Sequence, residues 1–359
     1  MLVFGTRPEA IKMCPLVSEL KSRDGIETVV CVTGQHREML DSVLDIFHIE
    51  PQYDLCVMKE KQTLFDITMN VLQQMEPVLQ TESPDLVLVH GDTATAFACA
   101  LACYYCDIPV GHVEAGLRTY CAHSPYPEEF NRQAISVIAD YHFAPTAPAR
   151  DNLLREGKRE DRVFVTGNTV VDAVKSTVRP DFSHEILDFA SGHRLIFITA
   201  HRRESLGEPM RRMFRAIRRV LREYPDVRAV YPIHKNPKVR IIAHEELSGC
   251  KNLFMTEPLD VAVCHNVMAR SFLILTDSGG IQEEASSLGK PVLVMRDTTE
   301  RPEGVLAGTL RLVGTDEQAI FEGCKLLLEN SAAYRAMTVQ SNPYGDGFAC
   351  KRIADILVK

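Results

Sequence analysis

Several carboxylates stand where acid–base chemistry would need them. Asp92 and Glu114 each come just after a short apolar run, Glu128 and Glu129 follow a proline-rich stretch, and His201 follows a similar run in the second half. A single carboxylate at a strand end is usually a helix cap or a salt-bridge partner, whereas several that converge near arginines favour proton transfer. Burial can raise the pKa of one carboxyl group while a cation keeps another ionised, which gives an acid and a base in one site.

A glycine turn with two cations predicts a phosphate site near the start of the chain. Gly5–Lys12 reads GTRPEAIK, which is typical of a strand, a tight turn and the start of a helix, with Pro8 suited to the first helical position. Arg7 lies beside that helix start and Lys12 one turn further on. Backbone N–H groups at a helix start, together with two cations, bind phosphate. The alternative is a solvated arginine and lysine on the surface of a helix.

A second glycine turn, Asp277–Gln282 (DSGGIQ), has the same pattern in the second half. Ser278 and the two glycines after it let the backbone approach an anion closely. Glu283 or Glu284, in the next helical turn, could bind the vicinal hydroxyls of a ribose. Simple helix capping is the alternative. Neither turn has the GxGxxG or GxxxxGK[ST] pattern, which disfavours the usual NAD and ATP sites.

Basic and charged residues follow other strand-like runs of the second half. His201-Arg202-Arg203-Glu204 and His234 suit a diphosphate, although a basic surface loop would have a similar composition. The loop Arg296–Glu303 (RDTTERPE) is either a solvated linker or a lid over a nucleotide. His112 and Glu114 form an HxE pair, but no further His or Cys lies at zinc spacing, so we expect no metal.

The elements that must hold these residues are strand-like runs alternating with helix-like segments. Strand followed by helix, repeated with short loops, predicts a parallel sheet with helices on both faces. The series occurs twice, so we predict two Rossmann-like doubly wound α/β domains facing a cleft. Ligands bind at the carboxyl ends of the strands in such sheets, which is where the polar residues cluster. The predicted strands are Leu2–Phe4, Thr28–Val32, Leu55–Met58, Leu86–His90, Val110–Val113 and Val163–Thr166, then Leu195–Thr199, Ala229–Ile233, Leu253–Thr256, Leu273–Leu275, Val292–Met295 and Leu310–Val313.

The restart of the pattern also predicts where one domain ends and the next begins. We expect a first domain of residues 1–167 plus 343–359 and a second of residues 168–342, with a hinge near Gly167–Asn168. The turn Asn342–Gly347 (NPYGDG) could carry the final helix, Ala349–Leu357, back to the first domain.

Bulk composition excludes several classes of protein. The chain has 359 residues, 45% of them hydrophobic, and a net charge of −8, which argues against a general nucleic-acid binder. No apolar run reaches the roughly 18 residues of a membrane span, and the first residues lack the regions of a signal peptide, so we expect a cytoplasmic protein without membrane partners. The 11 cysteines, including the Cys103–Cys106 CxxC, fit core packing in a reducing compartment.

Taken together, the motifs resemble one family, the non-hydrolysing UDP-N-acetylglucosamine 2-epimerases of bacteria. The similarity runs in order through nearly the whole chain. The matching stretches are GTRPEAIKMCPLV, TGQHREML, DLVLVHGD, PVGHVEAGLRT, SPYPEEFNRQ, VTGNTVVDA, TAHRRESLGEPM, ILTDSGGIQEEA, LGKPVLVMRDTTERPEGV, AGTLRLVGTD and NPYGDG.

The resemblance implies a glycosyltransferase-B-like fold and reversible conversion of UDP-GlcNAc to UDP-ManNAc without a cofactor. It implies anti elimination of UDP to 2-acetamidoglucal, followed by re-addition of UDP and return of a proton to the other face of C2. It further implies a homodimer that supplies precursors for cell-surface polysaccharide. The implied partners are therefore UDP-GlcNAc, UDP and a second copy of the chain.

The resemblance also implies roles for individual residues. The implied catalytic residues are Asp92, Glu114, Glu128 and His201. The implied contacts to UDP are Arg7, Lys12, Arg132, His234, Ser278, Gly279, Gly280, Glu284 and Arg301, with His201 also placed at the phosphates and Glu284 at the ribose. Which carboxylate removes the C2 proton and which returns it stays open.

Some members of the family bind a second UDP-GlcNAc as an allosteric activator. The residues implied for that site are Gln35, His36, Lys61, Gln62 and Arg202. Glu38 and Lys61 stand where the regulated members are expected to have Gln and Arg, so the resemblance leaves allosteric control open.

Three other functions are compatible with a sugar-nucleotide site. A UDP-dependent glycosyltransferase would need an acceptor, a hydrolysing epimerase would release free ManNAc and UDP, and a sugar-nucleotide sensor would bind without turnover. End-to-end similarity disfavours the hydrolysing type, and the intact carboxylates disfavour the sensor.

Overall fold

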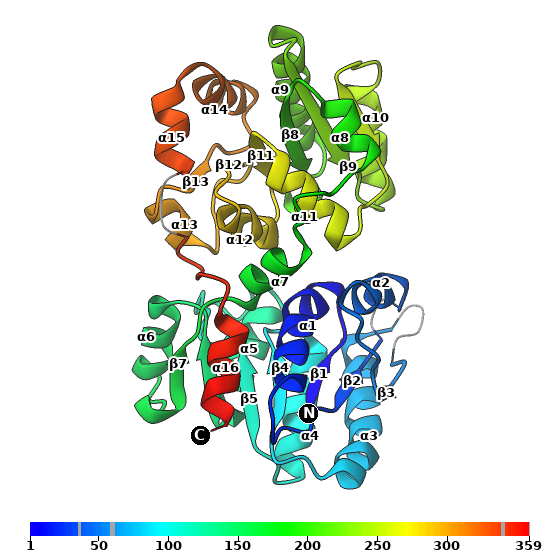
Figure 1. The fold of residues 1–359 in the computed structure, drawn as a ribbon, viewed down its shortest axis with the longest axis vertical. Coiled ribbons are helices and arrows are strands. Elements are labelled where there is room, and N and C mark those ends of the chain that lie inside the picture. The colour runs from blue at the N-terminus through cyan, green and yellow to red at the C-terminus, as the bar shows by residue number, and fades with distance from the viewer. Residues whose placement is uncertain (35–36, 58–61, 339–341, 359) are drawn as a thin grey trace. The chain divides into compact units, whose positions relative to one another are not determined.

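The computed structural model describes residues 1–34, 37–57, 62–338 and 342–358. These residues form two compact units, Met1–Ser176 with Gly345–Lys359 and Thr177–Tyr344 (Figure 1). Each unit is an α/β structure built on one parallel sheet, so the predicted pair of doubly wound domains is confirmed. No helix within these described ranges is long and apolar enough to cross a lipid bilayer.

The first unit has, in its described part, a seven-stranded sheet in the order β3-β2-β1-β4-β5-β6-β7. Its strands are β1 (Leu2–Phe4), β2 (Val30–Val32), β3 (Tyr53–Asp54), β4 (Val87–His90), β5 (Val110–Val113), β6 (Tyr141–Ala144) and β7 (Val163–Val165). Its helices are α1 (Arg7–Lys21), α2 (Arg37–Phe47), α3 (Leu64–Glu82), α4 (Ala94–Tyr105), α5 (Glu128–Ile138), α6 (Ala147–Arg155), α7 (Thr169–Thr177) and α16 (Ala349–Leu357). Helices α3, α4 and α5 pack side by side, and α1 packs against α2 and α16.

The second unit has, in the part that the structure describes, a six-stranded sheet in the order β10-β9-β8-β11-β12-β13. Its strands are β8 (Arg194–Thr199), β9 (Val227–Pro232), β10 (Leu253–Thr256), β11 (Leu273–Thr276), β12 (Val292–Val294) and β13 (Leu310–Leu312). Its helices are α8 (Glu185–Ala190), α9 (Glu208–Glu223), α10 (Pro237–Leu247), α11 (Val261–Arg270), α12 (Gly279–Ser287), α13 (Pro302–Leu306), α14 (Glu317–Glu329) and α15 (Ser331–Thr338).

Both sheets have a point where the strand order reverses. In the first unit β1 lies between β2 and β4, and in the second β8 lies between β9 and β11, with Thr199 paired to Thr276 at the carboxyl ends. Loops that leave such a point diverge to opposite sides of the sheet and open a crevice for a ligand. The turns after β1, β4, β8 and β11 are therefore the places where each unit can bind one.

Two strands differ from the sequence prediction. Strand β6 was not predicted, because its YHFA run is short and includes a histidine. Strand β3 is Tyr53–Asp54 and not the predicted Leu55–Met58, of which Met58 lies outside the described residues. Leu55 and Val57 are nevertheless buried, and their amides donate to Val32 and Thr33, so this apolar run does line the sheet edge.

The chain passes from the first unit to the second after Ser176, whereas the sequence suggested a hinge near Gly167. Two contacts hold the intervening segment to the first unit. Asn168 donates its side-chain amide to Glu114 (2.9 Å), and the Asp172 carboxylate accepts from the first two backbone amides of α16 (3.1 and 3.0 Å). Helix α7 therefore stays with the first unit, and so does the C-terminal helix.

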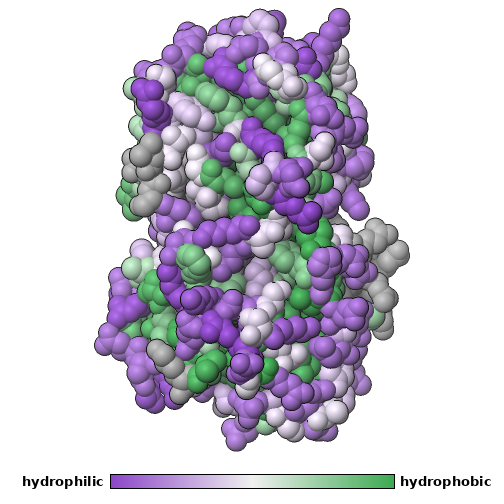
Figure 2. Space-filling model, viewed as in Figure 1, coloured by the Kyte–Doolittle hydropathy of each residue, from purple (hydrophilic) through white to green (hydrophobic). Residues whose placement is uncertain are grey.

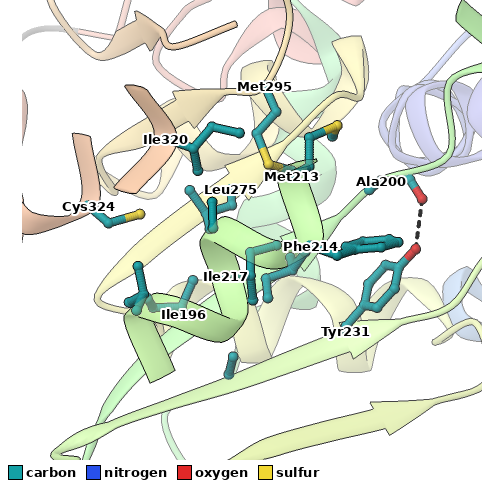
Figure 3. Close-up of a cluster of buried hydrophobic side chains, with 14 of the residues drawn as sticks. Ile196, Ala200, Met213, Phe214, Ile217, Tyr231, Leu275, Met295, Ile320 and Cys324 are labelled. Atoms are coloured by element: carbon teal, nitrogen blue, oxygen red, sulfur yellow. Dashed lines mark hydrogen bonds between the residues drawn. The ribbon is translucent and has the colours of Figure 1, made fainter. Parts of the chain in front are cut away.

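A hydrophobic core fixes the end of β8 in the second unit (Figure 3). Tyr231 on β9 is fully buried, packs its ring against Phe214 with the centroids 5.4 Å apart, and donates its hydroxyl to the carbonyl of Ala200 (2.8 Å). This bond holds the backbone at the residue that precedes His201.

The molecular surface in view is mostly hydrophilic, with apolar residues scattered between charged ones (Figure 2). All the cysteines are free, and Cys99 and Cys103 belong to the hydrophobic core of the first unit. The prediction of core packing is thereby confirmed for Cys103, the first cysteine of the CxxC.

Candidate functional site

A buried carboxylate, Glu9, fixes the helix start after β1. Thr6 caps α1, and the Glu9 carboxylate accepts from the amides of Gly5 (3.0 Å) and Thr6 (2.7 Å), which completes a capping box. The other Glu9 oxygen accepts from the Thr93 hydroxyl (2.7 Å), the cap of α4. Burial raises the pKa of Glu9, and these hydrogen bonds oppose that rise. Glu9 thus connects two turns through hydrogen bonds, the one that contains Arg7 and the one that contains Asp92.

Glu114 and Lys12 form a buried ion pair beside this turn. Only 9% of either side chain is exposed, and the same Glu114 oxygen accepts from Asn168 and lies 3.7 Å from the His90 ring. Glu114 has a φ of 64°, a conformation that costs a non-glycine residue energy and that concentrates at functional sites. Lys12, expected at the phosphates, is thus bound to a carboxylate in this structure.

Asp92 follows β4 and has a cation beside it. Its carboxylate is 3.0 Å from the Arg132 guanidinium, and its backbone carbonyl accepts from the Asn131 amide (2.9 Å). Arg132 is nearly buried, whereas 30% of the Asp92 side chain is exposed. Helix α5 therefore positions a carboxylate that solvent or a substrate can reach.

The neighbouring glutamates of α5 have different roles. Glu129 is fully buried, and its two oxygens accept from the backbone amides of Thr119 (3.0 Å) and Tyr120 (2.9 Å). This carboxylate therefore holds a loop, whereas the sequence grouped Glu129 with the acid–base residues. Glu128 begins the helix and is half-buried, and its carboxylate makes no hydrogen bond within the described residues.

A buried histidine supports the turn that carries Asp92. His112 lies on β5 with its Nε2 2.7 Å from the carbonyl of Gly91. Burial lowers the pKa of His112 to about 3, so the ring is neutral. A carbonyl can only accept, so Nε2 must be the atom that carries the ring proton. Gly91 has a φ of 65°, and His112 holds this left-handed turn in place.

In the second unit, Asp277 organises the turn after β8. Its Oδ2 accepts from the amides of His201 (2.6 Å) and Arg202 (2.8 Å), and its Oδ1 is 3.1 Å from His201 Nδ1. His234 lies on the other side of this ring, stacked at 5.3 Å. The sequence placed His201, Arg202 and His234 at strand ends, and the structure brings the three together around one buried carboxylate.

The start of α12, which the sequence predicts to bind an anion, follows β11 in the second unit. Ser278 is the cap residue but makes no side-chain cap bond, so its hydroxyl does not occupy the amides of the first helical turn. Arg301 lies against Gly279, where a Cβ would be only 3.0 Å from the guanidinium, and its Nε donates to Glu283 (3.0 Å). The predicted residues Ser278, Gly279, Gly280 and Arg301 therefore lie in one place.

Glu284 lies in the next turn of α12, and only 9% of its surface is exposed. Its Oε2 is 3.4 Å from the His265 ring, which is bonded in turn to the hydroxyl of Thr177 (2.6 Å). The other candidate ribose acid, Glu283, is paired with Arg301 (3.0 Å).

The remaining predicted residues fall in three groups. Arg7 is the first residue of α1 and is half-buried. Gln62 donates its amide to the carbonyl of Val57 (2.7 Å), and the Arg202 side chain donates to the carbonyl of Asp277 (3.2 Å). The other residues of the predicted allosteric site, which are Gln35, His36 and Lys61, lie outside the described residues.

The sequence did not predict residues that hydrogen-bond to the backbone or to residues distant in the chain. Asn168 donates to Glu114, and Asp277 accepts from the amide of His201; the sequence predicts neither contact. The signal for Asp277 was its position directly after an apolar strand. Within the described ranges, no group of three or more His, Cys, Asp or Glu side chains is arranged to hold a metal ion.

Comparison with known proteins gives a consistent result over the chain. A family model described as UDP-N-acetylglucosamine 2-epimerase matches residues 18–358. The chain is 58% identical over 358 residues to the UDP-N-acetylglucosamine 2-epimerase of Bacillus subtilis (strain 168), a match that covers 100% of this chain and 94% of that one. A Yersinia pestis protein of the same name is 50% identical, with 99% and 97% covered.

Solved structures agree with the sequence relatives. A UDP-GlcNAc 2-epimerase from Neisseria meningitidis bound to UDP-GlcNAc matches with a TM-score of 0.93 and 47% identity, and covers 99% of this chain and 98% of that one. The S. aureus MnaA–UDP co-structure matches with a TM-score of 0.92 and 53% identity, with 99% and 95% covered. The chain therefore belongs to the UDP-N-acetylglucosamine 2-epimerase family.

Proposed function

We propose that this protein catalyses the reversible inversion of C2 in UDP-N-acetylglucosamine, which yields UDP-N-acetylmannosamine. The observation that carries the proposal is the 58% identity, along the whole chain, to a protein named for this activity. The geometry of each unit supports it: carboxylates follow β4 and β5 in the first, and an anion-binding helix start follows β11 in the second.

The proposed reaction begins with an anti elimination. A carboxylate of the set Asp92, Glu114 and Glu128 takes the proton from C2 as the bond between C1 and the diphosphate oxygen breaks. The C2–H electrons form the C1=C2 double bond of 2-acetamidoglucal, and the C1–O electrons leave with UDP. UDP then adds back while a second carboxylate returns a proton to the opposite face of C2. Such general acid–base groups typically contribute about 10²–10⁴-fold in rate.

Binding of the diphosphate is the second part of the proposal. Arg7 at the start of α1, His201, and the backbone amides after Ser278 supply positive charge for the departing UDP, with Glu284 on the ribose. Charge stabilisation of this kind acts where negative charge develops and is often the largest catalytic contribution. The reaction needs residues of both units to act on a single substrate molecule.

The test is incubation of the pure protein with UDP-GlcNAc alone, followed by chromatography of the nucleotide sugars and proton NMR. The proposal predicts UDP-ManNAc with no added acceptor, and an equilibrium reached from either sugar. Free ManNAc with UDP would identify a hydrolysing epimerase instead. Turnover only after an acceptor is added would identify a glycosyltransferase, and binding without turnover a sensor.

We also propose that the protein is a homodimer joined through the outer surface of α3, α4 and α5. Large apolar side chains are exposed on these helices, namely Phe65, Met69, Tyr104, Tyr105, Phe130 and Val137. Large exposed apolar side chains on neighbouring helices support a protein interface there. Light scattering should give the mass of a dimer, and Val137→Lys should weaken it, whereas Ile241→Lys, an equally drastic change on α10, should not. A monomeric wild type would contradict the proposal.

The proposed location is the cytoplasm, and the proposed pathway supplies cell-surface polysaccharide. The free thiols support a reducing compartment, because disulfides form readily outside it. Fractionation of the native cells should place the protein with cytoplasmic markers, and loss of the gene should deplete a ManNAc-containing surface polymer. Recovery with periplasmic or extracellular markers would contradict the proposed location.

A further inference from the structure

Asp277 holds His201 in two ways at once. Its Oδ2 accepts from the backbone amides of His201 (2.6 Å) and Arg202 (2.8 Å), which fixes the main chain of the turn. Its Oδ1 lies 3.1 Å from Nδ1 of the His201 ring, which is within the distance of an ion pair. Asp277 is itself fixed, because it is fully buried and its amide donates to Thr199 across the β8–β11 pair.

The Asp277 carboxylate is charged although it is buried. Burial alone would raise the pKa of Asp277, but the His201 ring and the backbone amides outweigh burial and hold the pKa below its usual value. The other charged groups nearby are Arg202, whose side chain donates to the Asp277 carbonyl, and Arg296, whose interaction with Asp277 is electrostatic. A carboxylate in this position can accept a hydrogen bond from Nδ1–H and cannot donate one to Nδ1.

The remaining contacts leave one ring nitrogen of His201 for a ligand. The His234 ring stacks on the His201 ring with the planes 16° apart, so it covers a face and not an edge. Nε2 points away from Nδ1 and therefore away from Asp277, and it makes no hydrogen bond within the described residues. The Tyr231 hydroxyl bound to Ala200 prevents the turn from shifting relative to β9 (Figure 3).

We infer that Asp277 is a positioning residue that keeps Nδ1 of His201 protonated and directs Nε2–H to the diphosphate oxygen that leaves C1. The inference rests on the proposed function, because it takes the departing diphosphate as the partner of His201. With both ring nitrogens protonated, Nδ1–H faces the Asp277 carboxylate and Nε2–H brings a positive charge to the bond that breaks. No proton needs to move between Asp277 and His201.

The variant Asp277→Asn separates this role from that of a backbone support. An asparagine oxygen can still accept from the two backbone amides, while its NH₂ group can only donate to Nδ1, which favours the neutral ring with its proton on Nε2. We expect turnover of UDP-GlcNAc to fall about 10²-fold or more, with a smaller change in KM and an unchanged melting temperature. Asp316→Asn, at the cap of α14, is the matched control and should be neutral.

Two readouts test the coupling directly. In a His201→Gln background, Asp277→Asn should change turnover less than about 3-fold, because the ring it positions is gone. In ¹⁵N NMR of the UDP complex, Nδ1 of His201 should carry a proton in the wild type and lose it in Asp277→Asn. A wild-type protein that fails to epimerise UDP-GlcNAc would end the proposed function, but the NMR experiment would still decide the state of the ring.

Three results would overturn the inference. They are unchanged turnover in Asp277→Asn, an equal loss of turnover in the wild-type and His201→Gln backgrounds, and an unprotonated Nδ1 in the wild-type UDP complex. Urea denaturation of Asp277→Asn is measured first and should match that of the wild type. If it unfolds early, Asp277→Glu replaces it and should keep the Nδ1 proton while turnover falls through displacement of the ring.

Discussion

Asp92 and Glu114 both follow strands of one sheet, yet their surroundings differ. Asp92 is partly exposed and faces the guanidinium of Arg132, whereas Glu114 is buried against Lys12 and Asn168. The sequence could identify both as acids at strand ends. It could not pair Glu114 with a lysine 102 positions away, because that contact exists only once β1 and β5 lie in one sheet. The sequence thus identifies the types of residue at the site, whereas the fold determines which of them are in contact.

The first residue-scale prediction concerns Asp92. Asp92→Asn removes the base but keeps the shape and the contact to α5, so UDP should bind as before while turnover falls about 10²–10⁴-fold. Calorimetry with UDP and the epimerisation assay measure the two effects. Asp85→Asn, an exposed aspartate before β4, serves as the control. Unchanged turnover in Asp92→Asn would remove this residue from the chemistry.

The second residue-scale prediction contrasts the two glutamates of α5, Glu128 and Glu129. Glu128→Gln should lose most turnover and keep its stability, because its carboxylate makes no hydrogen bond within the described residues. Glu129→Ala should lower the free energy of unfolding by about 1–3 kcal/mol, because the amides of Thr119 and Tyr120 lose their charged acceptor. Urea denaturation and activity assays separate the two variants. The opposite pattern would show that Glu129 is the catalytic acid.

At the scale of elements, the helix starts could be predicted from the sequence, whereas the order of strands in each sheet could not. GTRPEAIK and DSGGIQ each carry a glycine turn, and GTRPEAIK also carries its capping residues; both predicted helix starts are present in the structure. Strand order depends on long-range pairing, and β6 lacked the apolar signal of its neighbours. The sequence therefore predicts that the candidate residues follow strands. It does not predict that these strands lie beside the reversal points at β1 and β8.

The element-scale prediction concerns the C-terminal helix. Asp172 on α7 accepts from the amides of Ala349 and Cys350, and α16 packs against α1. Asp172→Ala should loosen α16 by about 1–3 kcal/mol, because two helix-start amides lose their acceptor. Hydrogen exchange should then accelerate in residues 349–357 and not in the second unit. Asp188→Ala, on α8, is the control. Equal exchange in Asp172→Ala and wild type would contradict this account of the helix.

At the scale of the whole molecule, the proposal requires both units to bind one nucleotide. Arg7→Met in the first unit and His201→Gln in the second should each weaken UDP binding, because each removes a donor or a positive charge from the diphosphate. Calorimetry gives the affinities, and a loss of about 5- to 50-fold is expected for each variant. Arg150→Met, on α6, should have no effect. Full affinity in Arg7→Met would remove the first unit from nucleotide binding.

Stability should depend on pH through three buried histidines of the first sheet. Burial lowers the pKa values of His90, His112 and His142 to about 4, 3 and 4, below the 6.5 of an exposed ring. The unfolded chain therefore binds more protons than the folded one between these values. The stability is fully present above pH 6.5 and is lost as the pH falls towards 4.

The size of this effect follows from the same values. At pH 5 each of the three histidines should lower the free energy of unfolding by roughly 2 kcal/mol relative to neutral pH. Urea denaturation at pH 7.5 and pH 5 measures the difference. His112→Gln, which keeps a donor for Gly91, should reduce it, whereas His244→Gln at an exposed position should not. Equal stability at the two pH values would contradict the neutral, buried state of these rings.

The central claim is that the enzyme breaks and remakes the C2–H bond of the sugar. Proton NMR of UDP-GlcNAc incubated with the protein in D₂O tests it directly. The account predicts that a manno-configured UDP-sugar appears and that its C2 position carries deuterium. A manno product that keeps its original C2 proton, or no change in the UDP-GlcNAc spectrum while UDP still binds, would contradict it.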